Sequence, residues 1–195
     1  MASDVHLGLP IATFANGADF DAWLDAHALQ AQGLWLKMAK KTGRGQTIAR
    51  AEAIDAALCH GWIDGQLDKY DDDFWLIRFT PRKPRSKWSS KNRDRAVALI
   101  AAGRVRPSGL AQIEAARADG RWDSAYAPAS AAGVPPDLAA ALEANPKAGA
   151  FFATLTGANR YAILYRIGAV KKAETRARKI AQFIGMLERG ETIHG

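Results

Sequence analysis

The chain has 195 residues, of which 48% are hydrophobic and 24% charged, so it has an ordinary globular composition and enough length to bury a core. Its formal net charge is +7, and its one cysteine, Cys59, excludes an internal disulfide and a metal site built from several cysteines. No apolar run approaches the roughly 18 residues of a membrane span, and the N-terminus has no signal-peptide pattern. We therefore expect a cytoplasmic protein without an integral membrane segment.

The first part of the chain is predicted to mix helices with strands. Apolar residues at i, i+3, i+4 and i+7 predict a first helix, with His27 packed in the core on its apolar stripe. Alternating apolar residues predict the strands. The predicted elements are a helix at 16–28, a strand at 34–40, a helix at 49–60, and strands at 62–67 and 74–80. This order predicts an α+β unit with an antiparallel sheet of at least three strands.

From about residue 91 onward the helical period dominates. Helices are predicted at 91–102, 108–118, 137–144, 146–155, 160–167 and 174–189, and Asn145 before Pro146 is typical of a helix start. A stretch rich in Ala, Ser and Gly interrupts them. We expect an α+β domain over residues 1–126, a linker over 127–134 and an all-helical module over 135–190.

The positive charge is concentrated in residues 78–106, which contain ten Lys or Arg and one acid, Asp94. This segment carries a formal +9, so the rest of the chain is slightly acidic. Pro81 and Pro84 keep the start of the segment extended, because each fixes its own φ and restricts the preceding residue. A stiff basic segment is typical of a surface that meets phosphate, carboxylate or an anionic polymer.

The helix that follows this segment strengthens that prediction. Ser89 or Ser90 is expected to cap the helix, yet its first turn holds Lys91 and Arg93, where the helix dipole favours acids. Cations next to free amides at a helix start favour a bound anion, and a tryptophan there can stack on a base. The predicted anion-binding residues are Arg82, Lys83, Arg85, Lys87, Trp88 and Asn92.

Three interpretations of the basic segment stay open. Its arginines can pair with the acids Asp64, Asp68 or Asp71–Asp73 and serve only the structure. Alternatively, the segment binds a small anion, or it binds nucleic acid. A second basic group in the C-terminal helices would extend the surface if the two groups align, which the sequence does not decide. That second group consists of Arg160, Arg166, Lys171, Lys172, Arg176, Arg178 and Lys179.

A second candidate site is a pocket lined by Trp62, Asp64 and Arg78, in which an enzyme could act on a small anionic substrate. Asp64 is also expected to pair with an arginine. Cys59 is expected to pack in the core, because it lies about 100° from His60 around a helix and the two cannot act as nucleophile and base. No catalytic motif is present, and the histidines lack metal-ligand spacing, so no catalytic residue, cofactor or metal site is predicted.

Several motifs resemble the bacterial YdeI/OmpD-associated family. They are Ala57-Leu-Cys-His-Gly-Trp-Ile-Asp-Gly65, Arg78-Phe-Thr-Pro-Arg-Lys-Pro-Arg-Ser-Lys-Trp-Ser89 and Asp119-Gly-Arg-Trp122. Pro136-Asp-Leu-Ala-Ala-Ala-Leu142, Asn145-Pro146 and Lys172-Ala-Glu-Thr-Arg-Ala-Arg-Lys-Ile180 are similar to the helical module of that family, which is described as bacteriocin-protection or OmpD-associated. The first half is also faintly similar to the YjbR/CyaY-like fold, which favours an α+β structure.

The resemblance implies a role in surviving antimicrobial peptides. A chain of charge +7 repels cationic peptides, so such a role would be indirect. We therefore expect a non-enzymatic binding protein with a basic surface for an anionic ligand or nucleic acid. The alternatives are an enzyme that uses the Asp64/Arg78 pocket, and a protein-interaction adaptor that acts through the C-terminal helices.

Overall fold

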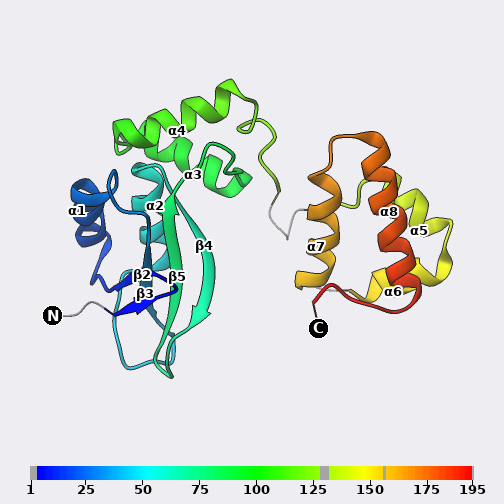
Figure 1. Cartoon of the computed structure of the whole chain (residues 1–195), viewed down its shortest axis with the longest axis horizontal. Helices are drawn as coiled ribbons and strands as arrows, with labels where there is room; N and C mark the ends of the chain where they lie inside the picture. Colours follow the sequence, from blue (N-terminus) through cyan, green and yellow to red (C-terminus); the bar gives the residue numbers. More distant parts are fainter. Residues whose placement is uncertain (1–3, 128–131, 156, 195) are drawn as a thin grey trace. The chain divides into compact units, whose positions relative to one another are not determined.

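The computed structural model describes residues 4–127, 132–155 and 157–194 (Figure 1). By its contacts the chain divides into two units, residues 1–125 and residues 126–195. The first combines a five-stranded sheet with helices, and the second is helical where it is described, so the predicted α+β class is confirmed. The predicted linker at 127–134 includes residues 128–131, which lie outside the described residues.

The sheet of the first unit has the strand order β1-β2-β3-β5-β4. Its strands are β1 (Val5–His6), β2 (Leu9–Ala12), β3 (Leu34–Ala39), β4 (Trp62–Lys69) and β5 (Phe74–Pro81). The predicted strands β3, β5 and β4 pair antiparallel, whereas β2 runs parallel to β3. Two parallel neighbours need a crossover connection, which the intervening helix α1 (Gly17–His27) supplies.

The two N-terminal strands were missed from the sequence because they have only two and four residues. They form a hairpin whose turn places Leu7 and Gly8 at positive φ, as a tight two-residue turn requires. His6 packs edge-on against Trp35 and its Nε2 lies 2.9 Å from Oδ2 of Asp68 on β4. This contact lowers the pKa of the Asp68 carboxyl and ties the hairpin to the far strand of the sheet.

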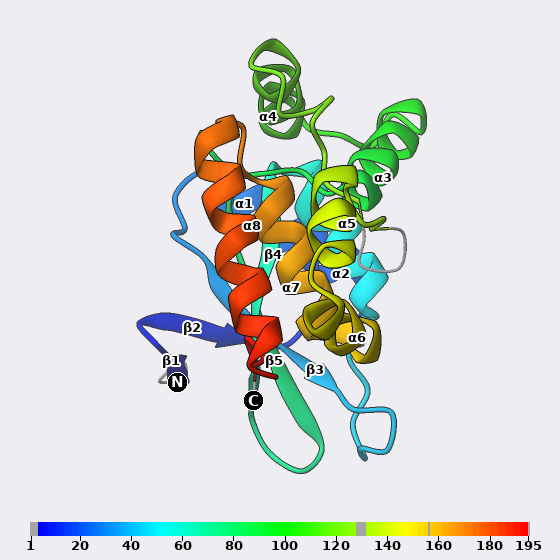
Figure 2. The ribbon, with the colours of Figure 1, turned by 90° about the vertical axis from the view of Figure 1, so that its right-hand side faces the viewer.

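Helices α1 (Gly17–His27) and α2 (Arg50–Cys59) supply the helical side of the main core (Figure 1). The hairpin of β1 and β2 lies at one edge of the sheet (Figure 2). Asn16 caps α1 by accepting the amide of Asp19 at 3.0 Å. The prediction that His27 is buried is wrong: its ring is exposed and stacks on Trp23 at the edge of the apolar stripe. The core includes Phe20, Leu24, Leu34, Leu36, Ala53, Trp62, Ile77 and Phe79.

Helices α3 (Ser90–Ala101) and α4 (Pro107–Ala118) enclose a second, smaller core with the end of α2. Gly109 allows α4 to approach α2 closely, because any Cβ at this position would collide with the Cys59 carbonyl oxygen. The members of this core are Leu58, Cys59, Trp88, Ala96, Leu99, Ile113, Ala116 and Trp122. Trp88 therefore belongs to the interior of the first unit.

The second unit consists of four described helices around its own core. They are α5 (Pro136–Glu143), α6 (Pro146–Thr154), α7 (Gly157–Gly168) and α8 (Ala173–Glu188), close to the predicted ranges. Asn145 caps α6 through the amide of Ala148, as its place before a proline indicates. Its core includes Leu138, Leu142, Phe152, Ile163, Leu164, Ile167, Phe183 and Leu187. Across the described ranges, no helix has the length and apolar character needed to cross a membrane.

Candidate functional site

The connection between β5 and α3, residues 82–89, has a fixed backbone. The amide of Arg82 donates to the Gly61 carbonyl at 3.0 Å. The amide of Ser86 donates to the Lys83 carbonyl at 2.8 Å, and the Ser86 hydroxyl accepts the Lys83 amide at 2.9 Å. These bonds fix the backbone of the connection in a turn at 83–86, so the prediction that the connection is extended is wrong here. Pro84 occupies the second position of this turn, where its fixed φ is favourable.

Two of the predicted anion-binding residues form the anchor of this connection. Arg82 is 5% exposed and Trp88 is 2% exposed. The guanidinium of Arg82 lies 3.6 Å from the centre of the Trp88 ring, a cation–π distance, and Trp88 meets Trp122 edge-on at 4.9 Å. Arg82 also donates to the Lys87 carbonyl. Their contacts face inward, so the Trp88 ring is not presented for stacking on a base.

The cations of the connection that do reach the surface are Lys83, Arg85 and Lys87, and Lys91 is exposed on the first turn of α3. Lys83, Arg85 and Lys91 form no ion pair with any residue that the structure describes. These four side chains are called the basic surface below. It keeps three of the six predicted residues and adds Lys91.

The first turn of α3 provides the polar end of this surface. Ser89, one of the two caps that the sequence allowed, accepts the amide of Asn92 at 3.1 Å. Asn92 is partly exposed, which leaves its side-chain amide within reach of solvent. No acid lies in this first turn, so the positive end of the helix dipole adds to the charge of Lys91.

Three later cations of the basic segment are paired with carboxylates, whereas Arg104 is exposed and forms no ion pair with a described residue. Arg95 pairs with Asp55 at 3.2 Å, Arg93 lies 3.1 Å from Asp94, and Arg106 reaches Asp25 at 2.8 Å. Three of the acids that were expected to pair with the arginines of this segment have other partners. Asp64 pairs with Arg50, Asp68 with His6, and Asp73 accepts the Arg44 amide.

The predicted Trp62/Asp64/Arg78 pocket does not assemble on one face of the sheet. Asp64 lies opposite Phe79, so both point to the face covered by α1 and α2, whereas the adjacent Arg78 points to the other face. Trp62 is buried and donates its Nε1–H to the Ala28 carbonyl at 3.2 Å. The three residues therefore do not converge on a common substrate.

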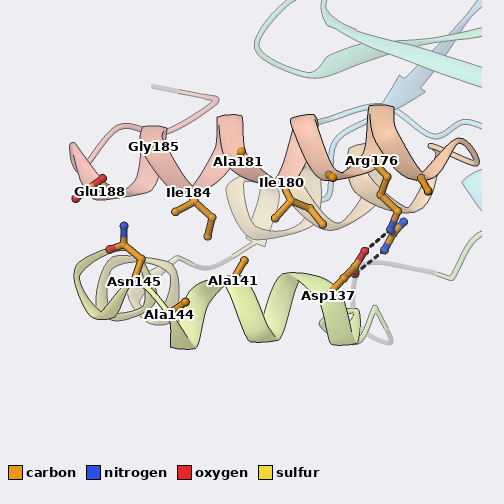
Figure 3. Close-up of a pocket in the computed structure, with 12 residues that line it drawn as sticks. Asp137, Ala141, Ala144, Asn145, Arg176, Ile180, Ala181, Ile184, Gly185 and Glu188 are labelled. Atoms are coloured by element: carbon orange, nitrogen blue, oxygen red, sulfur yellow. Dashed lines mark hydrogen bonds and ion pairs between the residues drawn. The ribbon is translucent and has the colours of Figure 1, made fainter.

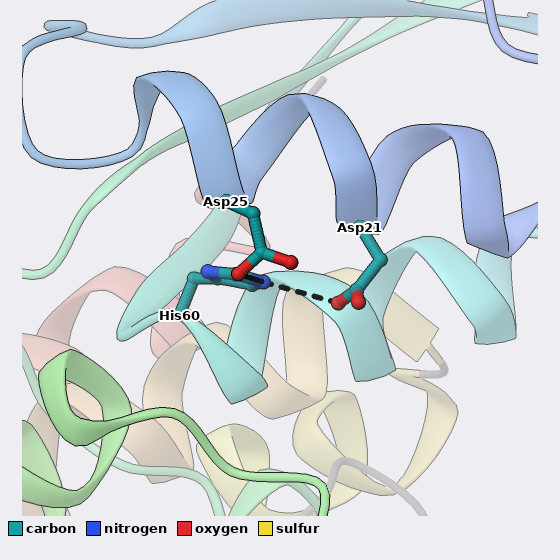
Figure 4. A group of neighbouring side chains, drawn as sticks. All are labelled: Asp21, Asp25 and His60. Atoms are coloured by element: carbon teal, nitrogen blue, oxygen red, sulfur yellow. Dashed lines mark hydrogen bonds and ion pairs between the residues drawn. The ribbon is translucent and has the colours of Figure 1, made fainter.

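A cluster that the sequence did not indicate joins α1, α2 and α4. The Nε2 of His60, a residue only 5% exposed, lies 3.0 Å from Oδ1 of Asp21 and 3.9 Å from Oδ1 of Asp25 (Figure 4). The only sequence signal is the i, i+4 spacing of the two aspartates on α1, because His60 follows 35 residues later. The three donor atoms lie within 4.8 Å of one another, close enough to hold a divalent metal.

This cluster already has a cation. The Nη2 of Arg106 lies 2.8 Å from Oδ2 of Asp25 and 3.4 Å from Oδ2 of Asp21, and the bond to Asp25 raises the pKa of Arg106. That guanidinium pairs with both carboxylates, and no further feature of the described residues indicates a metal. The arrangement is an ion-paired junction that fixes three helices.

Cys59, beside this junction, is buried as predicted. Burial raises the pKa of its thiol, which lowers the fraction of reactive thiolate. The thiol therefore acts as a small apolar side chain in the second core of the first unit.

The second unit carries a groove of about 700 Å³ between α5 and α8 (Figure 3). Its lining is mostly small or apolar, and an ion pair between Asp137 and Arg176 closes one end. The lining residues are Asp137, Ala141, Ala144, Asn145, Ala173, Arg176, Ala177, Ile180, Ala181, Ile184, Gly185 and Glu188. In the close-up, Ile184 and Ala141 point toward each other across the groove.

The fold and its surfaces define a two-unit α+β protein with a basic surface on the first unit and a groove on the helical second unit. Residues 12–112 match the family model described as Domain of unknown function (DUF8412), and the chain belongs to this family. Residues 131–190 match the OmdA model, described as Bacteriocin-protection, YdeI or OmpD-Associated, which confirms the resemblance for the helical module. Neither the curated proteins nor the solved structures gave a match.

Proposed function

We propose that this protein is a non-enzymatic binding protein that holds an anionic ligand, nucleic acid above all, on its basic surface. The proposal rests on a contrast between paired and unpaired cations within residues 78–106. Arg93, Arg95 and Arg106 are paired with carboxylates, whereas Lys83 and Arg85 are exposed and form no ion pair with a described residue. Cations without a protein partner are available to a phosphate.

The fixed backbone of the connection supports this role. The hydrogen bonds between Lys83 and Ser86, together with the buried Arg82–Trp88 contact, fix the backbone from which the exposed cations project before any ligand arrives. A site formed in advance loses less conformational entropy on binding.

A polymer suits this surface better than a small anion. Lys83 and Arg85 project from the turn at 83–86 and Lys87 from the residues after it, and Lys91 continues the positive charge onto α3. Charges spread along a chain segment match phosphates that repeat along a strand, whereas a small anion is held best by groups that converge on a point.

The description of the matched helical module supports a cellular role in protection against bacteriocins. We place this role in the cytoplasm and assign it an indirect mechanism, because a chain of charge +7 repels cationic peptides. Deleting the gene should raise sensitivity to such peptides, while the purified protein should not bind them. Direct binding of a cationic peptide would contradict the indirect mechanism.

The test is a fluorescence-anisotropy titration with labelled single- and double-stranded DNA and RNA. The triple variant Lys83→Ala, Arg85→Ala, Lys91→Ala should lose about tenfold or more in affinity, because three phosphate contacts disappear. The matched control is a second triple variant with the same loss of charge at exposed positions outside the basic surface. It carries Lys41→Ala, Arg44→Ala and Lys69→Ala.

Each outcome has a defined meaning. Retained affinity in the control together with loss in the first variant supports the assigned surface. An equal loss in both variants would show that overall charge, and not this surface, is responsible. If the unaltered protein binds none of the four nucleic acids at low salt, nucleic acid is refuted as the ligand, and inorganic phosphate and pyrophosphate become the probes.

A further inference from the structure

The motif Asp119-Gly-Arg-Trp122, at the end of α4, contributes no residue to the basic surface. Asp119 is the C-cap of α4, and Gly120 follows it at a φ of +75°, in the left-handed region that glycine adopts without strain. This conformation ends the helix and turns the chain, and the amide of Trp122 then donates back to the Ala116 carbonyl at 2.9 Å. The motif therefore has a fixed backbone of its own.

Arg121 joins this motif to the connection between β5 and α3. Its Nη1 donates to the Ser86 carbonyl at 2.9 Å, and its Nε lies 2.7 Å from Oδ2 and 2.9 Å from Oδ1 of Asp119. The hydrogen bond from Arg121 lowers the pKa of the Asp119 carboxyl, which is therefore ionised at neutral pH. A charged donor forms a stronger hydrogen bond with a carbonyl than a neutral donor does. The Ser86 carbonyl is thus held by a cation that Asp119 itself holds.

The next residue of the motif makes a second contact with the same connection. Trp122 is 9% exposed and its ring meets the ring of Trp88 edge-on, with the ring centres 4.9 Å apart. Two consecutive residues of the motif therefore hold residues 86–88 at both ends, Arg121 at the Ser86 carbonyl and Trp122 at the Trp88 ring. The turn at 83–86 is thus held from outside the basic segment.

We propose that the Asp119-Gly-Arg-Trp122 motif is a clamp that positions the turn at 83–86 for its ligand, with Arg121 as the positioning residue. This inference rests on the proposed function. Lys83 and Arg85 belong to the turn that Ser86 closes, so a bond to the Ser86 carbonyl restricts the backbone from which both cations project. A turn held in one conformation loses less conformational entropy when a phosphate binds. Arg121 is itself engaged by Asp119 and Ser86, so it acts through the turn.

The first test needs no ligand and measures the rate at which trypsin cuts the full chain after Arg85. Arg121→Gln should be cut there about tenfold faster than the unaltered protein, because the Ser86 carbonyl loses its charged donor. In the same sample, cleavage after Lys41, on another exposed turn, should keep its rate. The matched control Arg44→Gln removes the same charge at an exposed position and should leave the rate after Arg85 unchanged. An unchanged rate after Arg85 in Arg121→Gln, or equal acceleration at both bonds, overturns the clamp.

The second test separates positioning from direct contact with the ligand. Arg121→Gln should weaken binding to double-stranded DNA by about fivefold, because the turn must be ordered on binding. Its salt slope should stay within about 0.3 of the unaltered value, whereas Lys83→Ala should make the slope shallower by about 0.9, because only Lys83→Ala removes a phosphate contact.

The outcomes of the two tests are distinguishable. A slope that is shallower by about 0.9 in Arg121→Gln would show that this guanidinium contacts phosphate, and an unchanged affinity would show that the position of the turn does not matter. Either result overturns the proposal. If the unaltered protein binds no nucleic acid, the proposed ligand is refuted, and the cleavage rate after Arg85 still decides whether the clamp exists.

Discussion

Replacing Trp88 by alanine separates the structural role of this residue from a role in binding. The ring is 2% exposed, meets Trp122 edge-on at 4.9 Å and carries the Arg82 guanidinium at 3.6 Å. Replacing a buried Trp by Ala lowers the free energy of unfolding by about 3–5 kcal/mol. That range includes the loss of the cation–π contact with Arg82, because the same ring makes this contact and the packing against Trp122. A domain with a total stability of about 5–15 kcal/mol would lose a large fraction of it.

Urea unfolding followed by tryptophan fluorescence measures this loss. All six tryptophans of the chain lie before residue 126, so their fluorescence reports the first unit selectively. Trp88→Phe serves as the matched control, because it retains an aromatic ring under Arg82 and should lose less stability. A loss below about 1 kcal/mol in Trp88→Ala would refute the interior role of Trp88. Loss of nucleic-acid binding in Trp88→Phe without loss of stability would show that the ring touches the ligand.

Three further predictions follow from single contacts. Gly109→Ala drives a methyl group against the Cys59 carbonyl oxygen and should lower the free energy of unfolding of the first unit in urea by about 1–3 kcal/mol. In the control Gly168→Ala the new Cβ meets no atom within 4 Å, so the second unit should lose no stability. Equal losses in the two variants would contradict the close approach of α4 to α2. The Cys59 thiol, with its pKa raised by burial, should react with a disulfide reagent much faster in urea than in the native protein, and equal rates would show an accessible thiol. Arg176 holds the pKa of the Asp137 carboxyl below its ordinary value, so their contact stabilises the protein above pH about 4 and is lost as the pH falls through the lowered value. Asp137→Asn should flatten this acid dependence in circular dichroism, and an unchanged profile would refute it.

The helices were predictable because their signals are local. Asn145 before Pro146 fixed the start of α6, and Gly61 at positive φ follows the end of α2. The N-terminal hairpin was not predictable, because a two-residue strand gives no period. What holds it is a contact between His6 and Asp68, which are 62 positions apart. Contacts over such separations depend on the tertiary fold and leave no pattern in one sequence.

The candidate site was predictable in its location and not in its details. Charge density alone indicated the segment that contains Lys83 and Arg85. Charge density does not reveal which of these side chains are buried. Arg82 and Lys83 are adjacent and both cationic, yet Arg82 is buried and Lys83 is exposed. Arg82 is buried against the Trp88 ring, and Trp88 in turn packs against Trp122, which follows α4 in the sequence. Burial of that kind is a property of the folded core.

The ion pairs of Arg95 and Arg106 could not be predicted from the sequence for the same reason. Arg95 and Arg106 contribute as much formal charge to the sequence as Lys83 does. Their partners, Asp55 and Asp25, lie on earlier helices, 40 positions before Arg95 and 81 positions before Arg106. The charge that remains open to a ligand is therefore much smaller than the sequence total of the segment. Among the described residues, it lies in the connection, in the first turn of α3 and at Arg104.

The most direct test of the basic surface is the salt dependence of nucleic-acid binding. The logarithm of the association constant for double-stranded DNA should fall with the logarithm of the salt concentration, with a slope of about −0.9 for each neutralised phosphate. For the triple variant Lys83→Ala, Arg85→Ala, Lys91→Ala, the slope should be shallower by about 2–3. The same slope in the unaltered protein and in this variant would contradict the assignment of the basic surface.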